Sequence, residues 1–494
     1  MTSSVDKLAA ENRQFCAKLY LNGVAETILR SKSMELRSPG SILLISCYEL
    51  GHQPLGVALP FGFLERAGFV PDAMDIAVED FDDSKVAHAE FVGISVPMHT
   101  ALRLGVHVVA RIREVNPKCY ICFYGLYAAL NSDYLVQHGA DFCIGGEYEA
   151  LLVALVESLE SGSSTDIPKL IGPGKKSTAF LERLEFATPI RTALPPLEKY
   201  ASLEHNGDSR TAGYVEASRG CRHLCTHCPI PPVYGGRFFV IPQSVVLEDI
   251  RRQVRAEATH ITFGDPDFLN GPKHALRVVR AMNAEFPWLT FDITAKVEHL
   301  LKHGNDLPEL ADLGCLFIIT AVESLSDKVL TILNKRHTRE DVTAVLDICR
   351  DVGIALRPTW VAFTPWTTLD DYLEMLAFVE ANGLIDHVDP VQFVIRLLIP
   401  PSSWLANHPQ MLPYRGPLDE AKFTYRWKHP DPQMDRLHGD VSHLVEKDAQ
   451  AGKNPATTFG GIWNLAHGRQ PSAVTPFLTP DRICAPRLTE SWFC

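Results

Sequence analysis

Residues 213–228 read GYVEASRGCRHLCTHC, a strand-like run that leads directly into three cysteines. Cys221, Cys225 and Cys228 are spaced by four and three positions, and prolines and glycines follow them as far as Gly236. Because proline lacks a backbone N–H and glycine favours turns, this stretch is predicted to leave the strand as an irregular loop. Three thiols in such a loop, at the carboxyl end of a strand, predict a metal centre.

Downstream of this loop, short apolar runs alternate with helical stretches. Together with the run before the cysteines, they predict strands at 213–220, 260–267, 289–298, 316–324, 354–363 and 391–399. Continuous apolar strands separated by helices are typical of a parallel sheet. Six such units predict a partial (β/α)6 barrel over 206–405, with its chemistry at the carboxyl ends of the strands.

Upstream of the loop, a separate α/β alternation occupies 41–160. Its predicted strands are 41–47, 74–80, 91–97, 120–126 and 141–146. The same reasoning predicts a doubly wound, Rossmann-like domain. The remaining segments are predicted to be a helical lead-in at 1–40, a linker rich in Ser, Gly and Pro at 161–205, and an irregular C-terminal extension at 406–494 with one helix near 435–450.

Composition limits the classes of function. Hydrophobic residues make up 46% and charged residues 21% of the 494 positions, as in soluble enzymes. The net charge of -12 and the absence of a long Lys/Arg run argue against a nucleic-acid partner. No apolar run reaches the roughly 18 residues that span a bilayer, and the first 20 residues lack the pattern of a signal peptide. We expect a cytoplasmic protein without a membrane partner, whose scattered cysteines are reduced thiols.

The three clustered thiols fit two kinds of metal centre. A 4Fe-4S cluster normally takes four thiolates, so three cysteines leave one iron open for another ligand. A structural zinc ion would need a fourth ligand, which His223 or His227 could supply. Spacing alone leaves both readings open, and a chance grouping of three cysteines is the third.

Residues 213–400, with the C-x3-C-x2-C pattern at 221–228, resemble the radical S-adenosylmethionine (SAM) superfamily. The resemblance implies an enzyme whose 4Fe-4S cluster is held by Cys221, Cys225 and Cys228 and binds SAM at the open iron. Reductive cleavage of SAM would then yield a carbon radical that attacks a small-molecule substrate. It also implies an electron donor, either a reductase or a protein of the ferredoxin or flavodoxin type.

The resemblance further implies residues that contact SAM at the ends of the later strands. They are Gly264, Asp265 and Asp267 for the amino group, Glu323 and Ser324 for the ribose or amino-acid portion, and Arg357 for the carboxylate. The segment Gly-Asp-Pro-Asp stands where the superfamily usually has Gly-Gly-Glu. Simple capping of a loop is the alternative for the aspartates. For Arg357 and Arg396 the alternative is an ion pair with Glu216, Asp292 or Glu298, and Lys296 is equally ambiguous.

Residues 41–160 resemble the cobalamin-binding domain that precedes the barrel in one branch of these enzymes. The residues expected around a corrin are His52, Gly56, Ser95, Gly125 and Gly146, all at the predicted carboxyl edge of the sheet. The usual Asp-x-His-x-x-Gly pattern is not reproduced. The alternative is a domain that has kept the fold and lost the cofactor.

The chain ends RICAPRLTESWFC at 482–494. It resembles a bacterial radical SAM group whose members end in Cys-Cys-Ala-Glu-Pro or Cys-selenocysteine-Ala-Glu-Pro, and it stops where the second residue of that tail would stand. Cys494 is therefore predicted to be a catalytic thiol on a flexible tether that begins near Ala473. An ordinary terminus with a chance cysteine is the alternative.

Three functions follow from these patterns. The first is reductive cleavage of SAM with cobalamin-assisted methyl transfer to a small molecule. The second is transfer of the 3-amino-3-carboxypropyl group of SAM, without cobalamin, to a thiophilic acceptor such as arsenite. The third, from another class, is a metal-binding structural or sensor protein.

Overall fold

The computed structural model describes residues 34–175, 177–470 and 485–489. The chain divides after Tyr200 into two compact units. Unit 1 runs to Tyr200, and unit 2 starts at Ala201.

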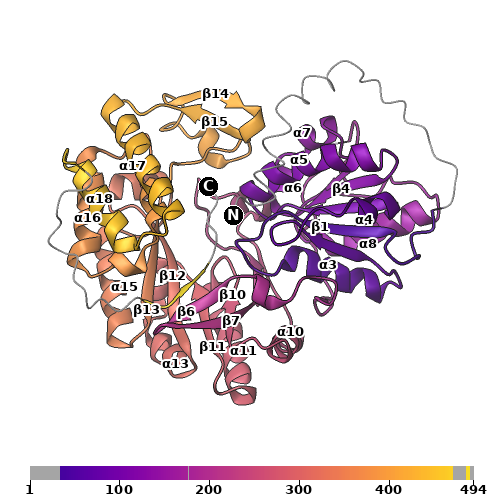
Figure 1. Cartoon of the computed structure of the whole chain (residues 1–494), viewed down its shortest axis with the longest axis horizontal. Coiled ribbons are helices and arrows are strands. Elements are labelled where there is room, and N and C mark those ends of the chain that lie inside the picture. The colour runs from indigo at the N-terminus through magenta and orange to yellow at the C-terminus, as the bar shows by residue number, and fades with distance from the viewer. Residues whose placement is uncertain (1–33, 176, 471–484, 490–494) are drawn as a thin grey trace. The chain divides into compact units, whose positions relative to one another are not determined.

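Unit 1 contains a five-stranded parallel sheet in the order β2-β1-β3-β4-β5 (Figure 1). The strands are β1 (Ile42–Ser46), β2 (Asp72–Asp75), β3 (Phe91–Ser95), β4 (Tyr120–Tyr124) and β5 (Phe142–Ile144). The helices are α3 (Leu55–Arg66), α4 (Asp83–His88), α5 (His99–Val115), α6 (Leu126–Leu130), α7 (Ser132–Gln137) and α8 (Glu149–Glu160). Helix α3 packs with α8, and α4 packs with α5. The predicted doubly wound domain is confirmed.

The second strand of unit 1 is shorter than predicted, and it lies earlier in the chain. It ends at Asp75 because the backbone N–H groups of Val78 and Glu79 both bond to the Asp75 carbonyl and form a turn. The Glu79 carboxylate accepts from the Asp75 N–H at 2.7 Å. The apolar pattern of 74–80 therefore covers half a strand and a turn.

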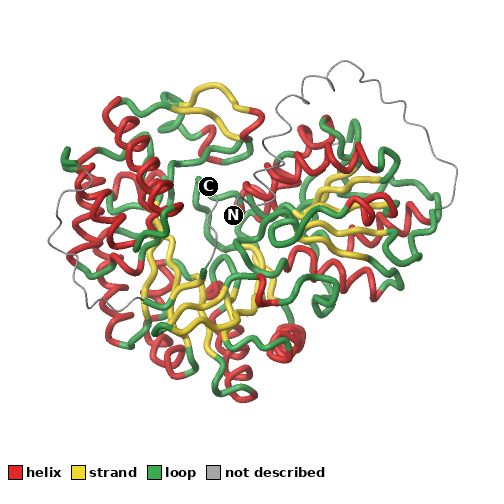
Figure 2. The backbone as a smooth tube through the Cα atoms, viewed as in Figure 1, coloured by secondary structure: helices red, strands yellow, loops and turns green. Residues whose placement is uncertain are grey.

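Unit 2 is built on a curled sheet in the order β13-β12-β11-β10-β7-β6-β16 (Figure 2). The strands are β6 (Ser202–His205), β7 (Asp208–Val215), β10 (His260–Phe263), β11 (Thr290–Thr294), β12 (Cys315–Glu323), β13 (Ala355–Trp360) and β16 (Arg487–Leu488). From β7 to β13 all neighbours are parallel. The partial barrel predicted from the sequence is confirmed.

Helices connect the parallel strands of unit 2. They are α10 (Gln243–Arg255), α11 (Pro272–Glu285), α12 (Val297–Lys302), α13 (Leu307–Asp312), α14 (Asp327–Ile332), α15 (Arg339–Asp351) and α16 (Leu369–Ala381). Helices α15 and α16 begin at capping boxes, in which Thr338 pairs with Asp341 and Thr368 with Asp371. These caps fix where each helix leaves the preceding loop.

The sixth predicted strand, 391–399, does not form. Its first half is the 3-10 helix η6 (Pro390–Val394), which begins with Pro390 at a position where a missing N–H costs nothing. The Gln392 side chain accepts from the Trp360 N–H at 3.0 Å and so occupies the edge of β13. Only one bridge, Phe363 to Arg396, pairs this stretch with the chain before it.

The C-terminal extension is more regular than predicted. It holds the hairpin β14 (Arg415–Asp419) and β15 (Thr424–Trp427), the paired helices α17 (Pro432–Gln450) and α18 (Pro455–Ala466), and strand β16. The predicted helix near 435–450 lies within α17. Strand β16 returns to the sheet and pairs antiparallel with β6, Leu488 opposite Leu203.

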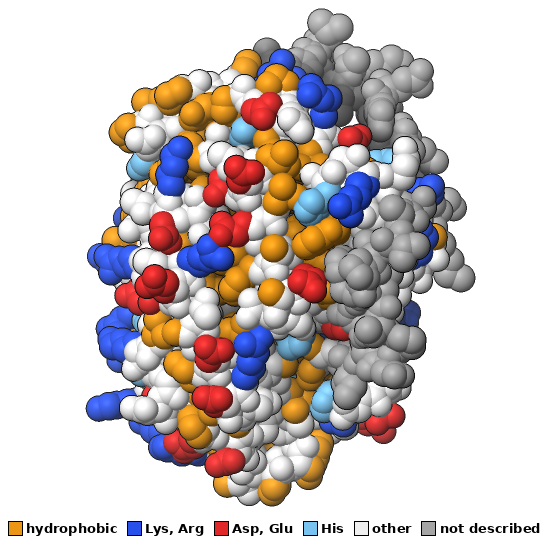
Figure 3. Space-filling view, turned by 90° about the vertical axis from the view of Figure 1, so that its left-hand side faces the viewer, with side chains coloured by type: hydrophobic (Ala, Val, Ile, Leu, Met, Phe, Trp, Pro, Cys, Tyr) orange, Lys and Arg blue, Asp and Glu red, His pale blue; other side chains and the backbone are white. Residues whose placement is uncertain are grey.

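On the face shown in Figure 3, acidic and basic side chains are interspersed among apolar ones. Within the described ranges, no helix has both the length and the apolar character needed to cross a bilayer.

Candidate active site

The three clustered cysteines lie in a loop, residues 221–237, which we call the cysteine loop. It connects two short antiparallel strands, β8 (Ser218–Gly220) and β9 (Phe238–Val240). The stretch was predicted to be irregular, but it contains the short helix α9 (Ile230–Tyr234), because prolines are tolerated in the first turn of a helix. Gly220 has φ +75° and passes so close to the Arg237 carbonyl that a Cβ would lie 2.5 Å from its oxygen. Only glycine fits this crossing. The strand pair therefore closes the base of the loop.

The three thiols form one buried group. Cys221 and Cys225 are 8% and 7% exposed, and Cys228 is partly buried. Burial, together with a smaller contribution from the neighbouring Cys225, raises the pKa of Cys221 to about 11 and of Cys228 to about 12. Thiolates at this position need a compensating cation. Three buried thiols whose ionisation requires positive charge fit the ligand set of a 4Fe-4S cluster with one open iron.

The backbone of the loop is held by residues far along the chain. The Asn270 side chain accepts from the Arg222 N–H at 3.1 Å. The Asn334 amide donates to the Leu224 carbonyl at 2.8 Å. Thr226 donates its N–H to the Leu333 carbonyl at 3.1 Å. These bonds fix the loop before any metal binds.

The first histidine of the loop, His223, points to a carboxylate at the end of β10. Its Nε2 lies 3.1 Å from Asp267 Oδ2, and His299 Nδ1 lies 2.7 Å from the same oxygen. Burial pushes the pKa of Asp267 up, but the hydrogen bonds from His223 and His299 outweigh it and hold the pKa below its usual value. Burial lowers the pKa of His223 despite the bond to Asp267.

The second histidine, His227, points to a carboxylate at the end of β12. Its Nε2 lies 3.3 Å from Glu323 Oε1, which also pairs with Lys335 Nζ at 3.3 Å. Burial opposes ionisation of Glu323, but Lys335 and His227 prevail and lower its pKa to about 2. Both histidines considered as zinc ligands thus contact carboxylates, so the structure favours the open-iron cluster over zinc on the cysteines.

A lysine contacts the cysteines directly. Lys296, just after β11, places Nζ 3.6 Å from Cys225 Sγ and 2.9 Å from the Lys335 carbonyl oxygen. It is 6% exposed. The sequence had left Lys296 between a structural and a functional role, and His299 and Lys335 had not been predicted as part of the site. No local pattern marks them, because each reaches the loop from a different strand end.

The other aspartate of the Gly-Asp-Pro-Asp segment binds the start of the loop. Asp265 accepts from the Ala217 N–H at 2.9 Å and from the Ser218 hydroxyl at 2.5 Å. Burial raises its pKa to about 7, although the two hydrogen bonds oppose this shift. Both aspartates that were expected to bind the SAM amino group therefore use carboxylate oxygens to accept hydrogen bonds from the cysteine loop and from its base.

We expect the stability of the protein to depend on pH through Asp265. Its folded pKa of about 7 lies above the ordinary value of 3.8, so the folded state binds more protons between these values. Stability should therefore fall as pH rises, by about 1.4 kcal/mol per pH unit between roughly pH 5 and 7. Urea unfolding of wild type and Asp265→Asn under anaerobic conditions measures this slope. Parallel curves for the two proteins would contradict it.

The remaining predicted SAM contacts near the loop have local roles. Gly264 passes the Tyr214 ring so closely that a Cβ would lie 2.1 Å from its hydroxyl oxygen. Ser324 Oγ accepts from the Ser326 N–H at 3.1 Å, directly after Glu323. Both positions lie at the strand ends that border the cysteine loop, so they remain candidates for a SAM surface.

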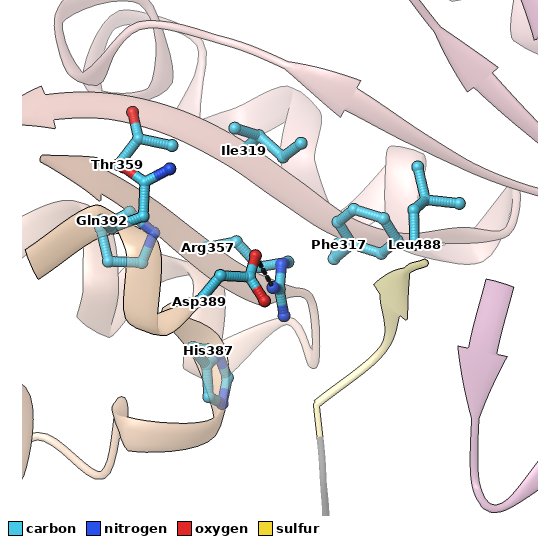
Figure 4. A pocket seen from close by; sticks show the side chains of 9 residues that line it. Phe317, Ile319, Arg357, Thr359, His387, Asp389, Gln392 and Leu488 are labelled. Atoms are coloured by element: carbon cyan, nitrogen blue, oxygen red, sulfur yellow. Dashed lines mark hydrogen bonds and ion pairs between the residues drawn. The ribbon is translucent and has the colours of Figure 1, made fainter. Parts of the chain in front are cut away.

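Arg357 lies elsewhere. Its Cα lies opposite Ile319 of β12, four residues before Glu323 along that strand, which is roughly 13 Å. There it pairs with Asp389 at 3.0 Å and donates to the Pro486 carbonyl at 3.3 Å (Figure 4). Arg357 therefore forms a structural ion pair, which was the alternative to SAM binding. Its partner, Asp389, was not among the three carboxylates considered, which were Glu216, Asp292 and Glu298.

Arg396 is also structural. It pairs with Asp435 at 2.8 Å and lies over the Trp427 ring. Its partner stands on α17, at the start of the one helix that the sequence predicted in the C-terminal extension.

In unit 1, the predicted corrin contacts share the carboxyl edge of the sheet, but not all of them face outward. A Cβ on Gly56 would lie 2.3 Å from Ser95 Oγ, so these two adjoin, and one on Gly125 would contact the Val96 backbone. One on Gly146 would lie 2.1 Å from the Phe180 carbonyl oxygen.

One of these positions does not fit a corrin contact, because the backbone of Phe180 bonds to Gly145 and Glu147 and so covers Gly146 with the unit's own chain. His52 and Ser95 are both buried, at 4% and 2% exposed. The roles expected for His52, Gly56 and Ser95 stay predictions.

Cys494 and Cys484 lie outside the described residues, so the role of Cys494 stays a prediction. The described stretch 485–489 is anchored instead of free. Thr489 donates its N–H to the Ser202 carbonyl, and Leu488 packs with Leu203 and Phe317. The predicted tether from Ala473 is therefore tied to the sheet before the last five residues.

The middle of the chain matches one known protein family. Residues 215–378 match the model of the Radical SAM superfamily. The hopanoid C-3 methylase of Methylococcus capsulatus is 24% identical over 332 residues, 64% of this chain and 62% of that protein. The chain thus spans less than two thirds of that relative's length.

Two solved structures are similar in fold. The cobalamin-dependent S-adenosylmethionine radical enzyme OxsB, with aqua-cobalamin and S-adenosylmethionine bound, has a TM-score of 0.67 at 15% identity, covering 86% of this chain and 68% of that one. The radical S-adenosylmethionine methyltransferase TsrM from Kitasatospora setae, with tryptophan substrate and a SAM analogue bound, has a TM-score of 0.59 at 15% identity, covering 87% and 96%. At this identity the likeness concerns the fold alone.

Proposed function

We propose that this chain, whose residues 215–378 match the Radical SAM superfamily, is a transferase that cleaves SAM reductively and transfers a methyl group to a small molecule. The observation that carries the proposal is the cysteine loop. Its three buried thiols are grouped, and its histidines are held by carboxylates from two strand ends. A loop fixed in this way presents a ligand set that leaves one iron open.

Each part of the site has a role in this proposal. Cys221, Cys225 and Cys228 hold the cluster, which when bound supplies the electron that breaks a carbon-sulfur bond of SAM. Asp267 and Glu323 position the loop through its histidines. Gly264 and Ser324, at the ends of β10 and β12, border the SAM surface. An external reductase or a ferredoxin or flavodoxin supplies the electron, since the described residues contain no second cysteine group.

We include a corrinoid in unit 1 as part of the methyl-transfer proposal. Bound cobalamin would carry the methyl group. The fold similarity supports this, whereas Gly146, which the Phe180 backbone covers, does not. The test is expression with hydroxocobalamin, followed by anaerobic purification and the absorption spectrum. About one corrinoid per chain supports the proposal, and none in a protein with four irons favours a vestigial domain.

At the carboxyl edge of the unit 1 sheet, the Phe180 backbone covers Gly146. This favours a second candidate function, the transfer of the 3-amino-3-carboxypropyl group to a thiophilic acceptor without cobalamin. Product analysis separates the two. Anaerobically reconstituted protein, incubated with SAM and a reductant, would form S-adenosylhomocysteine in methyl transfer and methylthioadenosine in aminocarboxypropyl transfer. Formation of 5'-deoxyadenosine alone would indicate hydrogen abstraction and contradict both.

The lysine at Cys225 leads to a prediction about the cluster's potential. An ammonium 3.6 Å from a ligand sulfur stabilises the more negative, reduced cluster. Lys296→Met should therefore lower the midpoint potential by roughly 60 mV, equivalent to about 1.4 kcal/mol for one electron. Anaerobic redox titration followed by electron paramagnetic resonance measures it. Lys302→Met, exposed on the same helix, serves as the control, and an equal potential in Lys296→Met and wild type contradicts the role.

A further inference from the structure

Three ligand-type atoms meet beside the cysteine loop without involving a cysteine. His223 Nε2 lies 3.1 Å from Asp267 Oδ2, and His299 Nδ1 lies 2.7 Å from that oxygen. The two nitrogens are 3.5 Å apart. All three residues are buried. They come from the loop, the end of β10 and helix α12, so the grouping is formed only by the fold.

The size of this triangle suits a metal ion. In a tetrahedral site with bonds of about 2.1 Å, neighbouring ligand atoms lie roughly 3.4 Å apart. The three observed separations, 2.7 to 3.5 Å, lie at or slightly below that value. An ion about 1 Å above the plane would be about 2.1 Å from all three atoms. Two imidazoles and one carboxylate are a usual ligand set for zinc or ferrous iron.

A second observation concerns the other nitrogen of His223. Glu298 Oε2 is buried and accepts no hydrogen bond among the described residues, yet it lies 3.4 Å from His223 Nδ1. His223 thus faces a carboxylate oxygen with each nitrogen, and a neutral ring can donate from only one. If a metal takes Nε2, the proton resides on Nδ1 and points to Glu298. Metal-bound histidines usually donate their second N–H to a carboxylate in this way.

Lys296 Nζ lies 3.9 Å from the same Glu298 oxygen, so this carboxylate has an ion-pair partner as well. Hydrogen bonds from the two histidines to Asp267 account for the triangle without an ion, whereas a divalent ion on His223 Nε2 also places the ring proton on Nδ1, facing Glu298. Asp267 is also pre-aligned as a ligand, because its Oδ1 accepts from the Leu269 N–H at 3.2 Å.

We propose that His223, Asp267 and His299 bind one divalent cation, Zn²⁺ or Fe²⁺, separate from the iron-sulfur cluster. The ion joins the cysteine loop to β10 and α12, and Glu298 orients His223 from behind. The site is structural: it adds a link between the cysteine loop and α12 to the hydrogen bonds that already hold the loop, so the cluster can form without it. It does not depend on which group of SAM is transferred.

The test is metal counting on the anaerobically reconstituted full-length protein after equilibration with Zn²⁺ and removal of the excess by gel filtration. Wild type should hold about one zinc in addition to four irons per chain. His299→Gln should retain the iron and lose at least tenfold in zinc. His303→Gln, at the C-cap of α12 and paired with Asp306, should retain both metals, since its ring meets that of His299 only edge-on, with centroids 6.0 Å apart.

Wild type with four irons and less than a tenth of a zinc per chain would overturn the proposal, as would equal zinc in wild type and His299→Gln. Zinc that rises only as iron falls would place it on the cysteines and also overturn it. If His299→Gln does not fold, zinc-edge X-ray absorption of wild type decides. Nitrogen and oxygen neighbours near 2.0–2.1 Å support the site, and sulfur near 2.3 Å contradicts it. A protein without iron refutes the cluster, not this site.

Discussion

Replacing Cys225 with Ala is expected to abolish the iron-sulfur cluster and, with it, all cleavage of SAM. Cys225 lies in the middle of the three thiols and contacts Lys296, so its loss leaves two ligands for four irons. We expect iron below one tenth of the wild-type content and turnover reduced at least a thousandfold. Three measurements test these effects: the iron content, the thiolate-to-iron charge-transfer absorption in the visible range, and the formation of products from SAM.

Cys349→Ala is the matched control, since Cys349 is equally buried but lies on α15 outside the loop. It should retain the cluster and most of the activity. An intact four-iron count in Cys225→Ala, or the same losses in Cys349→Ala, would show that the cysteine loop is not the cluster site.

Replacing Glu323 with Gln is expected to destabilise the protein by about 3–5 kcal/mol, because it leaves the Lys335 ammonium buried without a counter-charge. Lys335 is 2% exposed, and Glu323 is the acidic partner 3.3 Å from its Nζ. Anaerobic urea unfolding monitored by circular dichroism measures the loss. The double variant Glu323→Gln, Lys335→Met should recover part of it, since the uncompensated charge is gone.

The sign of the pH dependence gives a second check on Glu323. Its folded pKa of about 2 lies below the ordinary value of 4.5, so its contribution is complete above about pH 4.5 and is lost as pH falls toward 2. The difference in stability between wild type and Glu323→Gln should shrink over that range. A difference independent of pH, or no difference at pH 7, would contradict the ion pair.

The parallel strands could be predicted because continuous apolar runs report burial on both faces, as for β1 and β3. The run at 391–399 is also largely apolar, but its first half forms the 3-10 helix η6. There its own Gln392 side chain, and not its backbone, accepts the Trp360 N–H at the edge of β13. An apolar run shows that a segment is buried, but not whether its backbone or a side chain bonds to the neighbouring strand.

In the site, the cysteines could be predicted because their spacing is local. The direction of the acidic side chains could not. Asp265 and Asp267 were placed at the correct strand end, yet their carboxylates face the cysteine loop and its base. Arg357 was expected either to bind the SAM carboxylate or to form a structural ion pair, because an unpaired charge in an apolar strand is costly. Its partners, Asp389 and the Pro486 carbonyl, lie 32 and 129 residues away, and only the folded sheet brings them together.

Strand β16 can complete the sheet only after the end of the chain has been synthesised. Its Arg487 pairs with Glu204 of β6 across 283 residues, so β6 is made long before its outer neighbour exists. At translation rates of about 5–20 residues per second, that interval lasts roughly 15 to 55 seconds. During it the open edge of β6 is a template on which another nascent chain can pair. Slower translation of the last quarter of the message should therefore raise the share of aggregated protein, even though the finished molecule is unchanged.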